Sequence, residues 1–319
     1  MDVRTALKNG IAQLRNADVP SFTLAAELLL LHVLGLNRTW LYAHPEETVA
    51  ESDAQRFFAL IARRTAGEPT QHLTGKQEFW GLEFEVTPDV LIPRPETEHV
   101  IEVALDRLGL HEIRAGRPRK TDGAGLLIAD IGTGSGCIAI ALAKELPAAT
   151  FYATDISAAA LEVAHRNATR HEVAERIQFL ESNLLDRWLP VGAQHAAPLL
   201  GKVEDQARSP SASSRAALFD LIASNPPYIG RREAPTLPRE VRDHEPASAL
   251  YGGEEGYELY AGLIAQAATH LSPGGILVLE LGHDSLPAVQ PLLDAAIWTH
   301  VGVTNDLAGI PRVIAAEKI

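Results

Sequence analysis

The sequence is poor in cysteine, in basic residues and in long apolar runs, and each shortage excludes a class of protein. Cys137 is the only cysteine among 319 residues, so no disulfide can form within the chain. No stretch of about 18 uninterrupted apolar residues occurs, and we therefore expect no membrane-spanning helix. The N-terminus, with Asp2 and Arg4 among its first four residues, starts polar and lacks the apolar core of a signal peptide, which makes the cytoplasm the expected location.

Basic residues are outnumbered by acidic ones. The chain has 28 Lys and Arg against 41 Asp and Glu, a formal net charge of −13 at pH 7. Proteins that bind nucleic acid usually present a basic surface, because neutralised phosphates supply much of their affinity. The charge therefore weighs against direct nucleic-acid binding and fits a basic protein partner better. The twelve histidines include no pair spaced for zinc, so we expect no metal site.

Three regions with different periodicity follow one another. Residues 1–75 show the spacing of four short helices, which predicts an N-terminal helical-bundle domain. Such a bundle either docks a partner or only stabilises the next domain, and we weigh the two interpretations equally. Residues 76–95 predict a β-hairpin and a linker, because apolar and acidic residues alternate around a turn at Gly81. Residues 96–319 make up the third region.

Strand and helix patterns alternate from residue 126 onward. This alternation is typical of a doubly wound, Rossmann-like α/β domain with a mostly parallel seven-stranded sheet, which binds ligands at the carboxyl ends of its strands. Two aperiodic segments, 111–125 and Gln194–Arg215, are predicted to be a surface linker and a disordered insertion. The predicted strands are Leu126–Ala129, Thr150–Thr154, Ile177–Leu180, Phe219–Ala223, Ile276–Leu281, Ile297–Val303 and Val313–Ala316.

A glycine-rich loop, Gly132-Thr133-Gly134-Ser135-Gly136, joins the first of these strands to a helix. Glycines let the backbone turn sharply and approach a ligand, and the helix N-terminus adds free N–H groups. The third glycine comes one residue too early for the dinucleotide fingerprint, which disfavours a nicotinamide enzyme. We therefore interpret the loop as a site for a different cofactor, against the alternative of a tight turn without a ligand.

The second predicted strand ends at Asp155, about twenty residues after the glycine loop. At this separation an acidic side chain accepts hydrogen bonds from both hydroxyls of a ribose. The alternative role is a cap for the helix that starts near Ser157. We favour the ribose, because the glycine loop lies at the right distance along the chain.

The fourth predicted strand runs into Asn225-Pro226-Pro227-Tyr228, which suits chemistry at a planar amide or amine nitrogen. The prolines make the loop rigid, and the Asn225 side chain and Pro226 carbonyl can accept both hydrogens of an NH₂ group. The Tyr228 ring offers a flat surface for stacking. Two acceptors that orient the nitrogen favour the charge that develops on it during methyl transfer, without a dedicated general base.

These motifs together resemble the HemK/PrmC family of protein-(glutamine-N5) methyltransferases, which modify class-one peptide-chain release factors. The similarity covers nearly the whole chain and is strongest at the glycine loop, at Asp155 and at the Asn225–Tyr228 tetrapeptide. Further segments that are similar to family motifs are Glu68–Gly75, Phe79–Phe84, Leu91–Glu98, Glu240–Pro246, Leu250–Gly253 and Asp306–Gly309.

The resemblance implies a class I S-adenosylmethionine-dependent methyltransferase domain behind an N-terminal domain that docks the release factor. It implies methylation of the side-chain amide nitrogen of the glutamine in the factor's Gly-Gly-Gln (GGQ) motif, which tunes translation termination. S-adenosylmethionine would contact residues 132–136 and Asp155, and the target amide would contact residues 225–228. Asn183 and Leu184 would line the adenosine side of the cofactor, although the family often has Asp where Asn183 stands.

Three other functions stay open at this point. A related enzyme could methylate a glutamine of a ribosomal protein, and an adenine-N6 nucleic-acid methyltransferase could use the same tetrapeptide. The Ile92–Glu98 segment favours the release-factor branch over the first, and the acidic charge disfavours the second. A module that binds release factors or ribosomes without catalysis is the third, and the intact motifs argue against it.

Overall fold

The computed structural model describes residues 1–109, 122–188 and 218–319. The predicted insertion Gln194–Arg215 and most of the predicted linker 111–125 lie outside these residues. None of the helices within the described ranges is long and apolar enough to cross a membrane.

The N-terminal region is a helical bundle with its own apolar core, built around Leu29, Phe57 and Ile61. The four predicted helices are present, and a short fifth helix follows them. This fifth helix starts after Pro69 and ends at Gly75, which adopts the left-handed conformation (φ +71°) that glycine favours. The helices are α1 (Val3–Asn16), α2 (Phe22–Leu34), α3 (Arg38–Ala43), α4 (Glu51–Thr65) and α5 (Thr70–Thr74).

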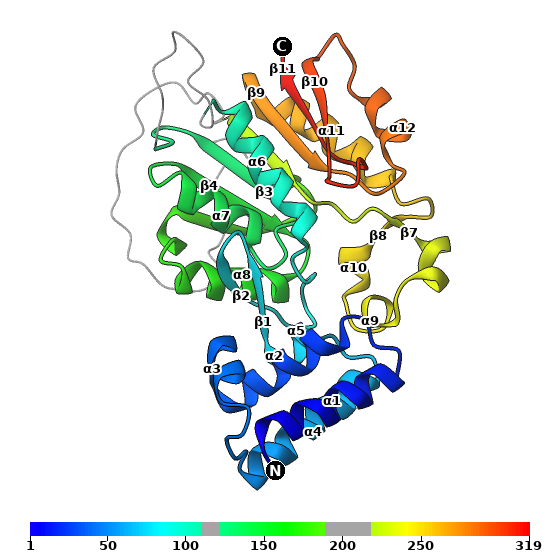
Figure 1. Cartoon of the computed structure of the whole chain (residues 1–319). Coiled ribbons are helices and arrows are strands. Elements are labelled where there is room, and N and C mark those ends of the chain that lie inside the picture. Colours follow the sequence, from blue (N-terminus) through cyan, green and yellow to red (C-terminus); the bar gives the residue numbers. More distant parts are fainter. Residues whose placement is uncertain (110–121, 189–217) are drawn as a thin grey trace.

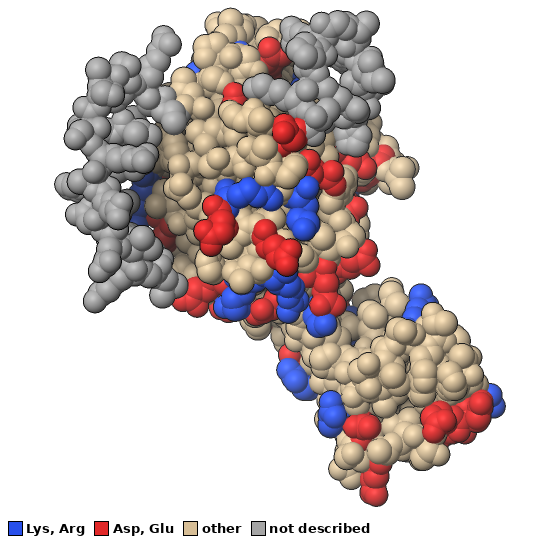
Figure 2. Space-filling view, turned by 90° about the vertical axis from the view of Figure 1, so that its left-hand side faces the viewer, with Lys and Arg blue, Asp and Glu red and all other residues tan. Residues whose placement is uncertain are grey.

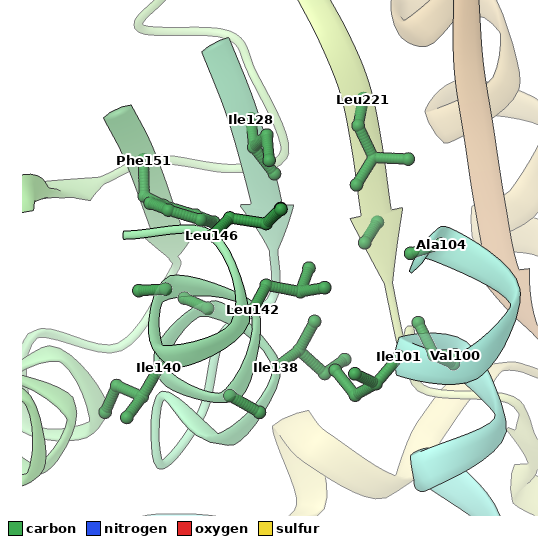
Figure 3. Close-up of a cluster of buried hydrophobic side chains, with 14 of the residues drawn as sticks. Val100, Ile101, Ala104, Ile128, Ile138, Ile140, Leu142, Leu146, Phe151 and Leu221 are labelled. Carbon is green, nitrogen blue, oxygen red and sulfur yellow. The ribbon is translucent and has the colours of Figure 1, made fainter. Parts of the chain in front are cut away.

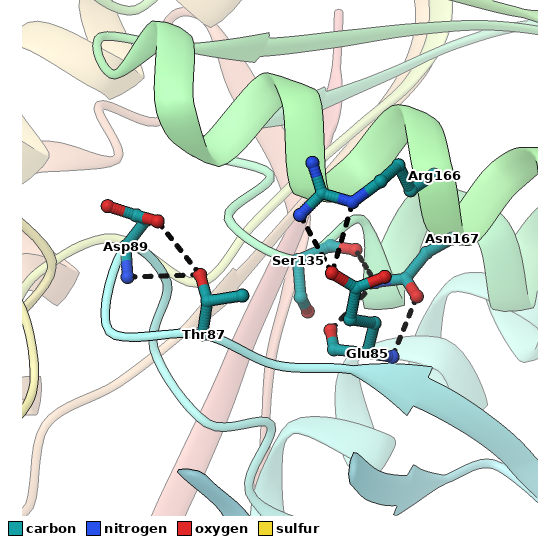
Figure 4. A network of polar contacts seen from close by, with 6 residues as sticks. All are labelled: Glu85, Thr87, Asp89, Ser135, Arg166 and Asn167. Carbon is teal, nitrogen blue, oxygen red and sulfur yellow. Dashed lines mark hydrogen bonds and ion pairs between the residues drawn. The ribbon is translucent and has the colours of Figure 1, made fainter. Parts of the chain in front are cut away.

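The predicted hairpin is formed by the antiparallel strands β1 (Lys76–Phe79) and β2 (Leu82–Glu85). Trp80 and Gly81 form its turn, both with positive φ. A buried asparagine, Asn167, connects the hairpin to the glycine loop (Figure 4). Its side chain accepts from the backbone N–H of Glu85 (2.7 Å) and donates to the carbonyls of Glu85 (3.0 Å) and Ser135 (2.9 Å).

The rest of the chain folds around one seven-stranded sheet of order β10-β11-β9-β6-β3-β4-β5. Strands β9, β6, β3, β4 and β5 are parallel, and β11 runs antiparallel to both β9 and β10. The predicted doubly wound, mostly parallel sheet is therefore confirmed. The strands are β3 (Leu127–Ile131), β4 (Thr150–Asp155), β5 (Ile177–Glu181), β6 (Phe219–Ser224), β9 (Leu271–Glu280), β10 (Trp298–Asn305) and β11 (Pro311–Lys318).

Helices cover both faces of the sheet, because successive strand residues point to opposite sides. Ile128 packs in the cluster of Figure 3, where α6 (Glu98–Arg107) and α7 (Cys137–Glu145) meet the strands. Ala129, the next residue, packs on the opposite face with α11 (Glu258–His270). Further helices of this region are α8 (Ala158–Arg170), α12 (Leu286–Val289) and the 3₁₀ turns η1 (Pro95–Thr97), η2 (Ala174–Arg176) and η4 (Gln290–Leu292).

Short elements between β6 and α11 lie between the sheet domain and the N-terminal bundle (Figure 1). The side chains of Arg64 in α4 and Glu240 form an ion pair across this region, although they are far apart in sequence. These elements are β7 (Ile229–Gly230), η3 (Arg231–Thr236), α9 (Arg239–Arg242), α10 (Ala247–Leu250) and β8 (Tyr251–Gly253).

Candidate active site

A cavity of about 240 Å³ opens at the carboxyl ends of β3, β4 and β6. Its lining includes Gly132, Gly134 and Asp155 together with Asn225. Both glycines have positive φ, and a Cβ atom added to either would meet no atom within 4 Å. The backbone of the loop is therefore open toward the cavity, as a close approach to a ligand requires.

Asp155 is part of the structure of the glycine loop as well as of the cavity wall. Its carboxylate accepts hydrogen bonds from the backbone N–H of Gly134 (2.9 Å) and of Ser157 (2.9 Å). Burial raises the pKa of Asp155, and these backbone hydrogen bonds oppose that rise. Ser157 itself caps α8 by accepting from the N–H of Ala160, so the helix does not depend on Asp155 for its cap.

A second buried carboxylate, Asp130, holds the glycine loop in place through hydrogen bonds. Its Oδ2 accepts from the hydroxyl of Thr133 (2.6 Å) and from the N–H of Ala139 (3.1 Å) at the start of α7. Desolvation raises the pKa of Asp130 to about 7. The neighbouring Cys137 is buried too, and its thiol pKa is raised to about 12 for the same reason, which fits its predicted packing role.

Most of the residues predicted to bind the cofactor meet in this cavity. Asn183 and Leu184, after β5, line the wall with Thr133 and Ser135. Gly136 does not line it: a Cβ at this position would come within 2.9 Å of Ile140 and 3.2 Å of Ala164. Gly136 thus packs against α7 and α8, and the close packing of these two helices requires glycine at this position.

A second cavity also borders the tetrapeptide. Pro226, Tyr228 and Arg94 line it, whereas Pro227 faces the first cavity. Asn225 lines both cavities, so its side chain stands between the glycine loop and the space beside Tyr228. Within the described residues, neither the Asn225 Oδ1 nor the Pro226 carbonyl accepts a hydrogen bond. Both predicted acceptors are therefore available to a ligand.

Two residues that the sequence analysis did not single out hold the tetrapeptide. The Nδ2 of Asn225 donates to the hydroxyl of Thr97 (3.0 Å), and the Tyr228 hydroxyl donates to Oε1 of Glu280 (3.2 Å). Both partners are almost completely buried. The ring of Tyr228 packs on Gly282, where a Cβ would lie 3.0 Å from the ring.

The segment that carries Thr97 is itself held by Glu245, another buried carboxylate. Glu245 forms an ion pair with Arg94 and accepts from the N–H of Ile92 (3.2 Å). Burial raises the pKa of Glu245, and Arg94 opposes the rise. The only sequence signal for Glu245 and Thr97 was that both lie in segments similar to family motifs, and Glu280 had no such signal.

Comparisons with known proteins identify the domains and the fold. Residues 5–75 match the family model of the PrmC N-terminal domain, and residues 120–193 match the methyltransferase small domain. The catalytic domain of hMettl16, solved in complex with a 3′UTR hairpin, shares the fold at a TM-score of 0.50 with 17% identity, over 81% of each chain. No group of three or more potential metal ligands gathers in the described part of the chain.

Full-length relatives are considerably closer in sequence. The release factor glutamine methyltransferase of Koribacter versatilis is 40% identical over 318 residues, which is 100% of this chain and 99% of the relative. That of Moorella thermoacetica is 41% identical over 319 residues, again 100% of this chain and 99% of the relative. The chain therefore belongs to the release factor glutamine methyltransferase family.

Proposed function

We propose that this protein transfers the methyl group of S-adenosylmethionine to the side-chain amide nitrogen (N5) of the glutamine in the GGQ motif of a class-one release factor. The observation that carries the proposal is the position of Asn225 between two cavities, one beside the glycine loop and one beside Tyr228. Cofactor and substrate amide can thus approach the same residue, each from its own cavity.

The residues of the first cavity fit S-adenosylmethionine. The open backbone at Gly132 and Gly134 accommodates its amino-acid portion, and Asp155 can accept from the ribose hydroxyls. Ile156, an apolar side chain that is 62% exposed, lines the cavity beside Asp155 and offers a surface for the adenine. When bound, this cofactor supplies an electrophilic methyl group on a sulfonium sulfur.

The tetrapeptide supplies what an amide nitrogen lacks as a nucleophile. The Oδ1 of Asn225 and the carbonyl of Pro226 accept the two hydrogens of the amide and aim its nitrogen at the first cavity. Both acceptors also favour the positive charge that develops on nitrogen. Among the described residues, those that line the cavity beside Tyr228 include no carboxylate, and the proposed role of the chain is to orient and polarise the amide, whose acidic proton can leave after the transfer.

Mass spectrometry of a purified release factor, incubated with the protein and S-adenosylmethionine, tests the proposal. We expect the glutamine peptide with the Gly-Gly-Gln sequence to gain the mass of one methyl group. Methyl groups found on a ribosomal protein or on nucleic acid, with none on this peptide, would contradict it. The Asn225→Ala variant serves as the inactive control.

A further inference from the structure

The side-chain amide of Asn225 has two ends with opposite hydrogen-bonding character. Its Oδ1 accepts and its Nδ2 donates, and the two ends occupy similar volumes. Only the orientation with Oδ1 toward the substrate can hold an N–H of the target amide. A 180° flip of this side chain would present a donor to a donor, so the proposed reaction requires a device that prevents the flip.

Thr97 is placed to be part of that device. It lies at the end of η1, which starts at Pro95, and it is 2% exposed. Its hydroxyl oxygen is 3.0 Å from the Nδ2 of Asn225. A hydroxyl both donates and accepts, however, so Thr97 alone does not decide which end of the amide faces it.

Glu280, at the end of β9, removes this ambiguity. It is 1% exposed; its Oε1 accepts from the Tyr228 hydroxyl, and hydrogen bonding by the Thr97 hydroxyl lowers the pKa of its carboxyl. Its Oε2 has no partner of good hydrogen-bond geometry within the described residues. An ionised carboxylate only accepts, so it attracts the single hydroxyl hydrogen of Thr97. The lone pairs of Thr97 are then left for Nδ2 of Asn225.

We propose that Thr97 and Glu280 are positioning residues for methyl transfer: the Glu280 carboxylate orients the Thr97 hydroxyl, and this hydroxyl holds Asn225 with Oδ1 toward the reacting amide. The inference rests on the proposed function. Thr97 lines the first cavity, but neither residue lines the cavity beside Tyr228 where the target amide would bind, so both act on that amide through Asn225.

Protonation of Glu280 would reverse the direction of the hydrogen bonds that link Glu280, Thr97 and Asn225. Its own hydrogen would go to Thr97, whose hydroxyl would then donate to Oδ1 of Asn225 and favour the flipped amide. Burial raises the pKa of Glu280 to about 7, so this reversal falls within an accessible pH range. The other charged or titratable groups that act on Glu280, or on which it acts, are Glu96, Cys137, Tyr228, Tyr260 and Arg312.

Steady-state kinetics with a release factor test Thr97 first. In Thr97→Val, which keeps the shape and loses the hydroxyl, we expect kcat to fall roughly ten- to a hundredfold. S-adenosylmethionine affinity, measured by calorimetry, should stay within about twofold. Thr97→Ser should recover kcat to within about threefold of wild type, because the hydroxyl returns. Thr70→Val, a buried threonine of the N-terminal bundle, is the matched control.

The pH profile tests Glu280 independently. The kcat of the wild type should rise with pH as Glu280 ionises. Glu280→Gln keeps a hydrogen-bond donor beside Thr97 at every pH, so the rise of kcat with pH should disappear. Its kcat at pH 8 should be roughly tenfold below that of wild type.

Three results would overturn the inference: normal kcat in folded Thr97→Val, a large loss of kcat in folded Thr97→Ser, or an unchanged rise of kcat with pH in Glu280→Gln. If the wild type does not methylate the release factor at all, the proposed function fails instead, so the two failures are distinguishable.

Discussion

At the scale of single residues, substitutions on the substrate side and on the cofactor side of the site should have different effects on turnover and cofactor binding. Asn225→Ala should lose most turnover and keep S-adenosylmethionine affinity within a few fold, because Asn225 orients the substrate amide. Asp155→Ala should weaken cofactor binding by about 1–3 kcal/mol through the loss of charge-assisted hydrogen bonds. Calorimetry and single-turnover assays on both variants separate the two effects. Near-normal turnover in the first, or unchanged cofactor affinity in the second, would contradict the assigned roles.

Glu280 should also make stability depend on pH. Its pKa is raised from 4.5 to about 7 in the folded state, so the folded protein holds the proton more tightly than the unfolded chain. The stabilisation is complete below about pH 4.5 and is lost as pH rises to about 7, at most about 3 kcal/mol. The free energy of unfolding of Glu280→Gln, relative to wild type, should therefore increase between pH 5 and pH 8 in urea titrations.

Asp130 serves as an internal reference for this experiment. Its pKa is also raised to about 7, and it contributes the same pH slope to both proteins, so the difference between them isolates Glu280. A difference that stays constant from pH 5 to pH 8 would show that Glu280 is ionised throughout this range.

At the scale of elements, the hairpin β1–β2 and the glycine loop are coupled through Asn167. Asn167→Ala removes three hydrogen bonds and leaves the backbone groups of Glu85 and the Ser135 carbonyl without their partner. We expect a loss of roughly 2–4 kcal/mol in the free energy of unfolding, together with weaker S-adenosylmethionine binding. The exposed hairpin ion pair between Lys76 and Glu83 provides the control, and Lys76→Ala should change neither quantity appreciably.

Elements could be predicted from the sequence where a periodic pattern was long, and less well where prolines and glycines interrupted it. The predicted strand Ile276–Leu281 is the second half of β9, which starts at Leu271. Pro273, Gly274 and Gly275 interrupt the apolar pattern, but the sheet includes them, with a register shift between β6 and β9. The short helix α5 was missed because five residues show no usable period.

The site could be predicted where chemistry and sequence position coincide, as at the glycine loop, Asp155 and the tetrapeptide. Thr97 and Glu280 could not, because they reach Asn225 and Tyr228 only through the fold. An acidic residue at the end of the apolar strand Ile276–Leu281 was the available signal for Glu280. The predicted domain boundaries at residues 75 and 95, and the cofactor contacts, stay predictions.

At the scale of the whole molecule, the Arg64–Glu240 ion pair joins the N-terminal bundle to the sheet domain. The side chain of Arg64 is 6% exposed, so Glu240→Ala would leave a buried cation without its partner. We expect a loss of about 2–3 kcal/mol, and unfolding of the bundle before the sheet domain in urea. Asp243→Ala, which removes an exposed ion-pair partner near the end of α9, is the control and should have little effect. A single unchanged transition in Glu240→Ala would show that the pair does not couple the two regions.

The surface charge on one face of the molecule is mixed in sign. On the face shown in Figure 2, basic and acidic side chains are interspersed over the described part of the larger lobe, and no continuous basic stripe runs across that part. Together with the net charge of −13, this pattern offers no extended track for a phosphate backbone on that face.

The burial of Cys137 has a practical consequence for measurements of release-factor binding in solution. Because the chain's one native thiol is buried and its pKa is raised to about 12, maleimide reagents at neutral pH should leave it almost unmodified. A cysteine introduced at an exposed position, such as the fully exposed Leu307 in the β10–β11 turn, would then be labelled selectively without removing any native residue from the core. The protein is thus ready for single-site fluorescent labelling, and a dye at residue 307 could report when a release factor arrives and leaves.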